Sequence, residues 1–180
     1  MKKVLAIFFI LISLFLSACG SKKVEAEYQK IKFDSLILQL PKNYVLVKLD
    51  NNLVDKFEVE QAYKEQNFSG FSSSLIISKY IWQYPNDIEK FFSVISDKFI
   101  KKVPGSKILD INDFSVWNIK VYYFTYSVSN NLFDNSKANY YWVQAYFFEP
   151  KQIYAINYLT YDENKLNDFV KLLKKIQLLK

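Results

Sequence analysis

The chain has no histidine and no arginine, a single cysteine and only three glycines. Without histidine it cannot form a Ser-His-Asp triad or an imidazole metal site, and no side chain has an ordinary pKa near neutrality. Gly20, Gly70 and Gly105 are too far apart to form the glycine loop of a nucleotide-binding protein. No serine is followed by lysine three residues later. These absences exclude the common catalytic motifs.

The first eighteen residues have the pattern of a secretory signal. Lys2 and Lys3 precede an apolar run from Val4 to Leu16, and the small residues Ser17 and Ala18 follow it. Thirteen helical residues at about 1.5 Å each reach roughly 20 Å, which is short of the ~30 Å hydrocarbon core of a bilayer. We therefore expect residues 1–18 to be a signal peptide that is removed.

The only cysteine stands directly behind this run. Leu16-Ser17-Ala18-Cys19 resembles the bacterial lipobox, in which the cysteine thiol receives a diacylglycerol and becomes the new N-terminus. Two or three acyl chains make a stable anchor, since each buried methylene contributes about 0.8 kcal/mol. The resemblance implies that Cys19 is lipidated and that the protein is held outside the cytoplasm. The alternative is an ordinary secretion signal in which the position of Cys19 has no meaning.

The residue after the cysteine bears on which membrane holds the protein. Gly20 stands there, not aspartate, and this resembles the default signal for the outer membrane of a bacterium with two membranes. With one membrane, the expected place is the outer surface of the cell membrane.

Loss of Lys2 and Lys3 lowers the net charge from +6 to +4, a mild excess. Every basic residue is lysine, whereas arginine is the residue that suits bidentate recognition of phosphate and guanine, so a nucleic-acid partner is not expected. Lipidation of Cys19 would leave no thiol for a disulfide, a nucleophile or a metal ligand. We expect neither a metal nor another cofactor.

Residues 19–30 are polar and lack apolar periodicity, which predicts a tether. As a flexible coil, the eleven residues after Cys19 would have a root-mean-square reach of roughly 18 Å. From Ile31 the patterning is unbroken, so residues 31–180 are expected to form one domain whose core its many aromatic residues can fill.

Alternating and β-branched or aromatic segments predict a succession of strands. They cover residues 31–40, 44–49, 57–63, 72–82, 107–113, 116–129, 138–149 and 152–161, the last two as a hairpin around Pro150-Lys151. Two segments predict amphipathic helices. Asn86 and Glu89 form a capping box for a helix that stops at Pro104-Gly105, and Asp162 caps the last helix. The expected apolar face of the first helix consists of Ile88, Phe91, Phe92, Ile95, Phe99 and Val103. That of the last helix consists of Leu166, Phe169, Val170, Leu173 and Ile176.

Strands in meander order with two inserted helices indicate an α+β domain built on an antiparallel sheet. The order of the elements resembles that of the PsbP-like superfamily, which includes exported lipoproteins such as those of the DcrB family. The resemblance covers nearly all of the mature chain. The segments that carry it are LQLPKNY, SLIISKY, a helix, PGSK, VYYFTY, YAINYLTY and a closing amphipathic helix.

This resemblance implies a single domain with an antiparallel sheet flanked by amphipathic helices, an α/β/α sandwich. Members mostly serve as accessory or assembly factors and not as enzymes, and the family offers no catalytic motif to carry onto these positions. Some members bind metal or stabilise photosystem II, but the chain has no histidine through which a metal role would carry over.

Two pairs of carboxylates are the remaining candidates for acid-base chemistry or weak calcium binding. Asp110 and Asp113 could meet across a turn, and Asp162 and Glu163 are adjacent. The structural interpretation is stronger for both: Asp110 and Asp113 fit the turn between two strands, and Asp162 fits a helix cap. We therefore expect no catalytic residue.

Aromatic residues and two loops have the most functional promise. Alternation places three aromatic side chains on one face of the strand at 116–129 and four on one face of the strand at 138–149. If a helix covers this face, the seven side chains belong to the core. If it is exposed, they form a surface for a ligand or a partner. They are Tyr122, Phe124 and Tyr126, and Tyr140, Trp142, Tyr146 and Phe148. The loops carry Phe68, Phe71, Leu132 and Phe133 between polar residues. We regard these four as candidate contacts to a partner or membrane, against the alternative that they fold back onto the domain.

Three functions remain open. The first is a non-catalytic lipoprotein that acts as an interaction or assembly module with a protein partner in the envelope. The second is a small-ligand-binding lipoprotein, which a cavity lined by Trp117, Trp142 or tyrosines would favour. The third is a carboxylate-dependent hydrolase, which would require two facing acids in a cleft.

Overall fold

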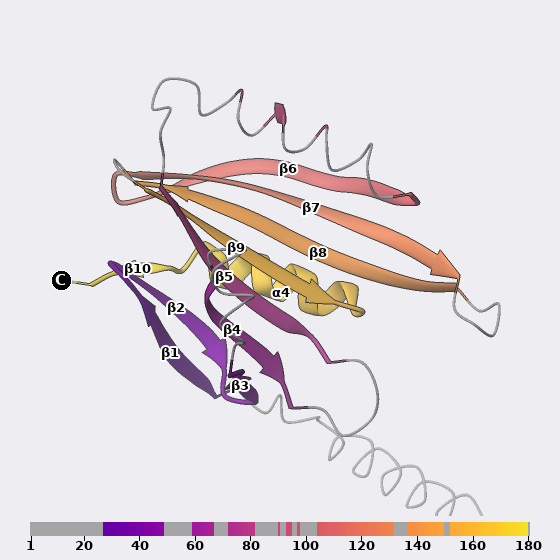
Figure 1. Ribbon diagram of the computed structural model, residues 1–180, viewed down its shortest axis with the longest axis horizontal. Helices are drawn as coiled ribbons and strands as arrows, with labels where there is room; N and C mark the ends of the chain where they lie inside the picture. Colours follow the sequence, from indigo (N-terminus) through magenta and orange to yellow (C-terminus); the bar gives the residue numbers. More distant parts are fainter. Residues whose placement is uncertain are drawn as a thin grey trace, which may run out of the picture.

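The computed structural model describes residues 27–48, 59–66, 72–81, 90, 93–94, 97, 104–131, 137–149 and 152–179. The signal peptide and most of the tether predicted for the N-terminus lie outside these ranges. Ten strands and one helix have defined bounds there (Figure 1). They are β1 (Tyr28–Phe33), β2 (Leu36–Pro41), β3 (Tyr44–Leu46), β4 (Val59–Glu65), β5 (Ser74–Ile81), β6 (Ser106–Val116), β7 (Ile119–Asn131), β8 (Lys137–Phe148), β9 (Gln152–Thr160), α4 (Glu163–Leu173) and β10 (Gln177–Leu178).

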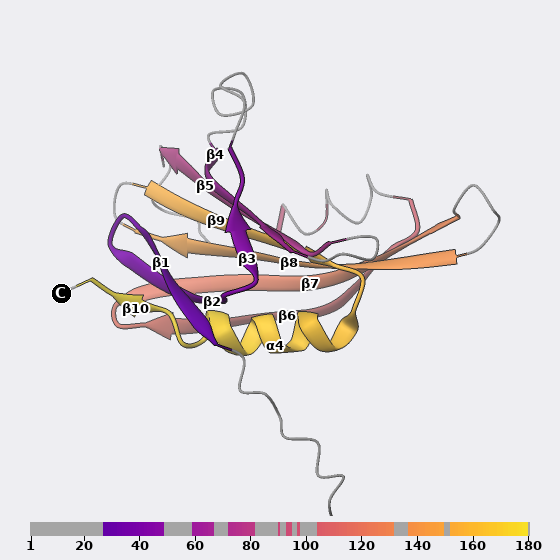
Figure 2. The same ribbon diagram turned by 90° about the horizontal axis from the view of Figure 1, so that it is seen from below.

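The strands form two antiparallel sheets. The larger has the order β3-β4-β5-β9-β8-β7-β6 and the smaller the order β1-β2-β10. Every strand pair described is antiparallel. Helix α4 lies along one face of the larger sheet, where the smaller sheet packs as well (Figure 2). The prediction of an α+β domain on an antiparallel sheet is confirmed.

The segment predicted as one strand over residues 31–40 is a hairpin. Strand β1 pairs with β2 from Tyr28 opposite Pro41 to Phe33 opposite Leu36, and the chain reverses at Asp34-Ser35. Asp34 has a φ of +48°, a left-handed conformation that aspartate tolerates better than most residues. The prediction of a single strand was wrong because it overlooked a change of phase: the alternating apolar positions are odd-numbered up to Phe33 and even-numbered from Leu36, as expected for two strands joined by a two-residue turn.

The turn predicted at Asp110 to Asp113 is also absent. Strand β6 runs without a break through both residues, and it reverses into β7 at Trp117-Asn118. Trp117 takes the left-handed conformation, with a φ of +56°. Position 118 holds asparagine, a common hairpin-turn residue, so this turn could have been found in the sequence.

Helix α4 begins as predicted, because the Asp162 carboxylate accepts a hydrogen bond of 2.8 Å from the backbone N–H of Asn164. The helix ends at Leu173, three residues before Ile176, the predicted last member of its apolar face. Ile176 lies beyond it and is still buried. The chain then adds β10, which pairs with β2 and which the sequence did not predict.

Four residues of the helix predicted between Asn86 and Val103 are described. Lys90, Ser93, Val94 and Asp97 are helical and exposed. Their spacing of three, four and seven residues places them on one face of a helix, complementary to the apolar face predicted for this segment. The side chains of that predicted apolar face lie outside the described residues.

Both faces of the larger sheet are apolar. One face packs against α4 and the smaller sheet and carries the main core. The second face carries the aromatic residues predicted on β7 and β8: Phe124, Tyr126, Tyr146 and Phe148 are buried, and Tyr122, Tyr140 and Trp142 are half-buried. These rings contact one another, with Tyr126 stacked on Trp142 at 5.3 Å between centroids. The interpretation of this aromatic surface as core is confirmed for the four buried residues.

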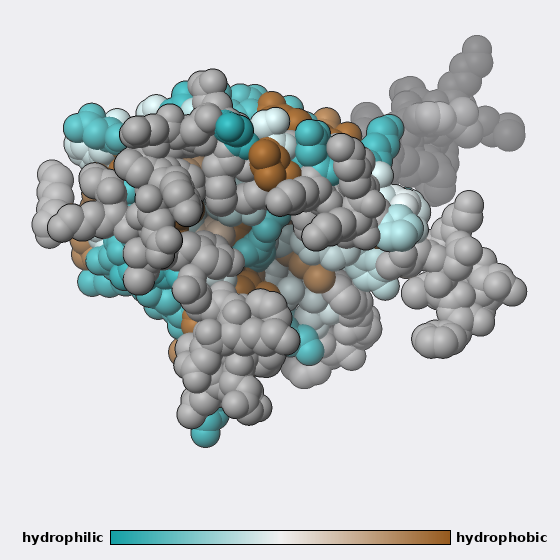
Figure 3. All heavy atoms as spheres, turned by 45° about the horizontal axis from the view of Figure 1, so that its top comes forward, coloured by the Kyte–Doolittle hydropathy of each residue, from teal (hydrophilic) through white to brown (hydrophobic). Residues whose placement is uncertain are grey.

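Apolar side chains also reach the surface. On the face in Figure 3 they appear in several separate places among hydrophilic residues. Within the described part of the chain, no helix is both long and apolar enough to cross a membrane.

Candidate functional site

A cleft of about 620 Å³ lies where α4 passes the start of β1 and the turn between β2 and β3. This volume falls in the range of small-molecule sites. Residues distant in sequence form its walls. They are Glu27, Tyr28, Leu40, Pro41, Lys42, Asn43, Tyr44, Glu65, Tyr158, Lys165, Asp168, Phe169 and Leu172.

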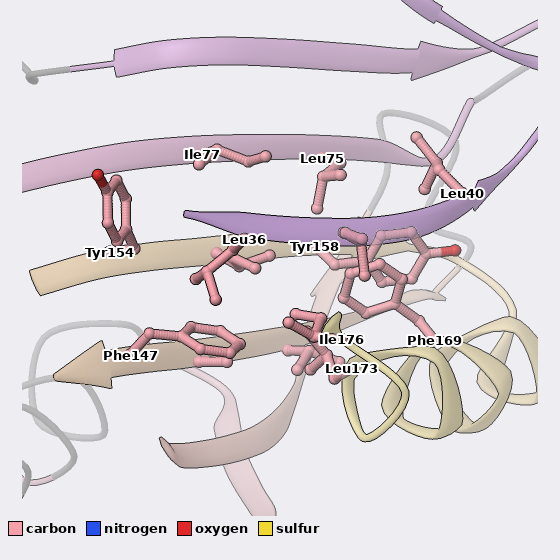
Figure 4. Packing of buried hydrophobic residues seen from close by; sticks show 14 of the residues in the cluster. Leu36, Leu40, Leu75, Ile77, Phe147, Tyr154, Tyr158, Phe169, Leu173 and Ile176 are labelled. Carbon is pink, nitrogen blue, oxygen red and sulfur yellow. The ribbon is translucent and has the colours of Figure 1, made fainter. Parts of the chain in front are cut away.

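The apolar part of the cleft comes from the main core. Phe169 and Leu172 belong to the buried face of α4, and Leu40 is the last inward-facing residue of β2 before the turn. The ring of Phe169 stacks on that of Tyr158 with 4.1 Å between centroids and 9° between planes. Figure 4 shows these two rings together where the helix approaches the sheet. The stacked pair gives the cleft a rigid aromatic wall.

Tyrosine hydroxyls supply hydrogen-bonding groups on another part of the wall. The hydroxyls of Tyr44 and Tyr158 lie 3.0 Å apart and form a buried hydrogen bond. Beside them, the Ser73 hydroxyl donates to that of Thr160 at 3.0 Å. Burial raises the pKa of Tyr44 and Tyr158 above the ordinary value. Both tyrosines are therefore neutral hydroxyls at physiological pH.

A partly buried ion pair joins β4 to α4 at the same place. Lys165 Nζ donates to Glu65 Oε1 at 2.6 Å, and the side chain of Glu65 is only 8% exposed. Asn43 donates to the same oxygen at 3.1 Å, and the backbone N–H of Ser73 contacts Oε2 at 3.4 Å. Burial alone would raise the pKa of Glu65, but the hydrogen bonds from Lys165 and Ser73 outweigh it and lower the pKa below 4.5. Glu65 is thus a carboxylate.

Each acidic residue that lines the cleft has a lysine partner. Besides the Glu65 pair, Lys42 contacts Glu27 at 2.7 Å and Lys171 contacts Asp168 at 2.8 Å. Because the charges are compensated pair by pair, the cleft has no unmatched charge with which to favour an ionic ligand. It combines an apolar wall with hydroxyl and amide groups, which suits an uncharged amphiphile.

The chemistry of the lining fits binding better than catalysis. The buried hydroxyls of Tyr44 and Tyr158 have raised pKa values, and the most buried acid of the lining, Glu65, is held ionised by Lys165. Among the described residues, no group of three or more metal-ligating acids or cysteines comes together.

The carboxylate pairs considered from the sequence do not form a site. Asp110 and Asp113 are three residues apart on one strand, so their side chains point to opposite faces. Asp113 forms an ion pair with Lys120 across the β6–β7 hairpin. Asp162 is the N-cap of α4, as predicted, and the neighbouring Glu163 is exposed in the first turn of that helix.

The residues predicted for lipidation and for partner contact lie outside the described part of the chain. These are Cys19, Phe68, Phe71, Leu132 and Phe133. Conversely, Tyr44, Glu65, Tyr158 and Lys165 were not singled out from the sequence. The sequence placed Phe169 on the apolar face of the last helix, but it gave no indication that Glu65 and Lys165 would meet beside it.

No protein-family model matches the sequence, and no curated protein matches it. The structure is similar to that of LpqN of Mycobacterium tuberculosis, a protein involved in cell envelope biogenesis. The TM-score is 0.57 at 12% identity, over 86% of this chain and 91% of LpqN. It is also similar to the cyanobacterial PsbP of Synechocystis sp. PCC 6803, with a TM-score of 0.58 at 11% identity, over 89% of this chain and 97% of PsbP. The domain has a PsbP-like fold.

Proposed function

We propose that the protein is a non-catalytic lipoprotein of the bacterial cell envelope whose cleft binds a small, uncharged amphiphilic ligand. The observation that carries the proposal is the tyrosine-lined cleft, with its stacked Tyr158 and Phe169 rings beside the Tyr44 hydroxyl and the Glu65–Lys165 pair. A cavity of this kind favours ligand binding over a purely protein-protein role. The mostly preformed walls lower the entropic cost of binding.

The envelope location rests on the N-terminal segment. Cys19 follows a signal-like apolar run, and it would anchor the protein at the outer membrane or, in a cell with one membrane, at the cell-membrane surface. The structural similarity to LpqN, itself an envelope-biogenesis protein, is compatible with such a location. The interaction of Phe68, Phe71, Leu132 and Phe133 with an envelope protein remains a prediction.

Binding is tested on the lipidated protein in phosphatidylcholine nanodiscs. The probe is hexyl glucoside carrying a diazirine in its alkyl chain, added from the aqueous phase at increasing concentration. After illumination, mass spectrometry locates the labelled peptides. We expect saturable labelling of the peptides that contain Phe169 and Leu172, with competition by unmodified hexyl glucoside.

Two tryptophan variants provide the matched comparison. Leu172→Trp places a bulky ring in the cleft, whereas Leu109→Trp places one at a 41%-exposed position of β6. Labelling should be lost in the first variant and retained in the second. Absence of saturable labelling in the wild-type cleft would refute the proposed function.

A further inference from the structure

The cleft lies at the point where the chain leaves for the predicted lipid anchor. Glu27 and Tyr28, the first two described residues, both line it. Cys19 is eight residues before Glu27. Eight residues span at most about 29 Å, the length that they reach when the chain is fully extended. A lipidated Cys19 would therefore keep the rim of the cleft within that distance of the bilayer surface.

Exposed apolar side chains lie next to the same rim. Tyr28 is 47% exposed and Leu46 is 65% exposed. Leu46 is on the same face of β3 as Tyr44, whose ring lines the cleft. Val45 and Val47, each 39% exposed, alternate with Leu46 and therefore point to the opposite face.

The start of β1 is held against this strand. The side-chain amide of Gln29 donates to the backbone carbonyls of both Pro41 and Tyr44. These hydrogen bonds keep Tyr28 close to the turn that leads into β3. Tyr28 and Leu46 thus form an apolar rim beside the cleft, which is costly in water and favourable in a bilayer interface.

The charge pattern selects among membrane lipids. The acids of the cleft are matched by Lys42, Lys165 and Lys171, so neither an anionic nor a cationic headgroup gains an unpaired counter-charge. The Tyr44 hydroxyl and the Asn43 amide can hydrogen-bond to hydroxyl or ester oxygens. An uncharged headgroup fits these groups best.

We infer that the cleft takes up one acyl chain of an uncharged membrane lipid directly from the bilayer to which the protein is anchored. The apolar rim of Tyr28 and Leu46 meets the interface, and the acyl chain lies against Leu40, Phe169 and Leu172 with its head near Tyr44 and Asn43. This inference rests on the proposed function and specifies the ligand and the side from which it enters.

The test uses the same lipidated protein in phosphatidylcholine nanodiscs that contain a diacylglycerol with a diazirine at the end of one acyl chain. A phosphatidylglycerol with the same chain serves in a parallel sample. We expect diacylglycerol to label the peptide containing Phe169 and Leu172, and phosphatidylglycerol to label it at least about tenfold less. Leu172→Trp should abolish the labelling, and Leu109→Trp should retain it.

A rim variant covers the possibility that Leu172→Trp unfolds the domain. Leu46→Gln changes a side chain that is 65% exposed, so the fold should tolerate it. It should reduce labelling of the cleft by diacylglycerol while leaving labelling by water-borne hexyl glucoside unchanged. Unchanged diacylglycerol labelling in this variant would refute entry over the apolar rim.

The remaining outcomes separate the two proposals. Labelling by hexyl glucoside without labelling by diacylglycerol would overturn the membrane-lipid inference and leave the proposed ligand binding in place. Labelling by neither probe would overturn both. Equal labelling by diacylglycerol and phosphatidylglycerol would overturn the selection for an uncharged head.

Discussion

The hydroxyl of Tyr154 donates a hydrogen bond to the carboxylate of Asp34, which ties β9 of the larger sheet to the turn of the β1–β2 hairpin. Gln152 donates to the same carboxylate oxygen at 2.7 Å. The hydrogen bonds from Tyr154 and Gln152 lower the pKa of Asp34 and keep it ionised. This junction fixes the smaller sheet on the larger one, and the smaller sheet supplies Leu40 and Pro41 to the cleft.

Tyr154→Phe should therefore destabilise the domain by about 1.5 kcal/mol, because it removes a hydrogen bond to a charged group and keeps the buried ring. Urea unfolding monitored by circular dichroism measures the change. Tyr28→Phe is the control, since that tyrosine is on the same hairpin and exposed. Equal stability of the Tyr154 variant and wild type would show that the hydrogen bond adds nothing to the attachment of the hairpin.

Gly105→Ala should destabilise the domain by more than about 1 kcal/mol. Gly105 has a φ of +76°, and a Cβ there would lie 2.8 Å from the backbone oxygen of Ser129.

Trp117→Gly is the opposite case: Trp117 has a φ of +56° and is 68% exposed, so glycine relieves strain with little loss of packing. It should leave stability unchanged or raise it by up to about 1 kcal/mol. Thermal unfolding of both variants checks the two signs.

The Glu65–Lys165 pair should make stability depend on pH at both extremes. The pKa of Glu65 is lowered from 4.5, so its contribution is complete above that pH and is lost as the pH falls through the folded-state value. Burial would lower the pKa of Lys165, but its contact with Glu65 raises it above 10.5, so that contribution is complete below pH 10.5 and is lost at higher pH. Glu65→Gln should flatten both ends of the stability profile measured by urea unfolding.

Lys165→Met leaves the Glu65 carboxylate buried without its cation and should cost about 1–3 kcal/mol near neutral pH. The matched control is Lys171→Met, because Lys171 pairs with Asp168 at the surface, where both side chains are 70% exposed. That change should cost less than about 0.5 kcal/mol. Similar costs for the two variants would mean that burial of Glu65 does not strengthen its ion pair.

Cys19→Ala should leave the domain folded and abolish processing and membrane anchoring, since folding and tethering use separate residues. Metabolic labelling with a radioactive fatty acid and membrane fractionation measure both effects. A variant that is still lipidated and membrane-bound would refute the assignment of Cys19.

The predicted loop contact is tested by crosslinking the lipidated protein in its native membrane. Leu132→Ser with Phe133→Ser should lose any protein partner that wild type captures, because these apolar residues are expected to supply the contact. Circular dichroism verifies folding of the variant. A partner retained by the double variant would contradict the proposed contact.

Much of the fold follows from local sequence. Alternation predicted strands β5, β8 and β9, Pro150-Lys151 marked the hairpin between the last two, and Asp162 marked the start of α4. Errors arose where local signals were missed or ambiguous. The apolar alternation changes phase at Asp34-Ser35, a sign of two strands that was overlooked, and the two-residue β10 forms only because β2 offers it a partner.

The candidate site could not be predicted in this way. Glu65 and Lys165 are 100 residues apart, and Tyr44 and Tyr158 are 114 apart. Neither pair belongs to a motif with fixed spacing, and each residue alone fits an ordinary strand or helix. Their proximity depends on the pairing of β3 with β4, of β5 with β9, and on the packing of α4.

By itself, the sequence determined which chemistry is absent, where most elements lie and which of their faces are apolar, because composition and periodicity act within a few neighbouring residues. Only the tertiary structure decided that both faces of the larger sheet bury aromatic residues and that a cleft with paired charges forms beside α4. The physical reason is that burial drives apolar faces together without specifying their partners. Strand order and helix packing then determine which polar groups meet at the edge of the core.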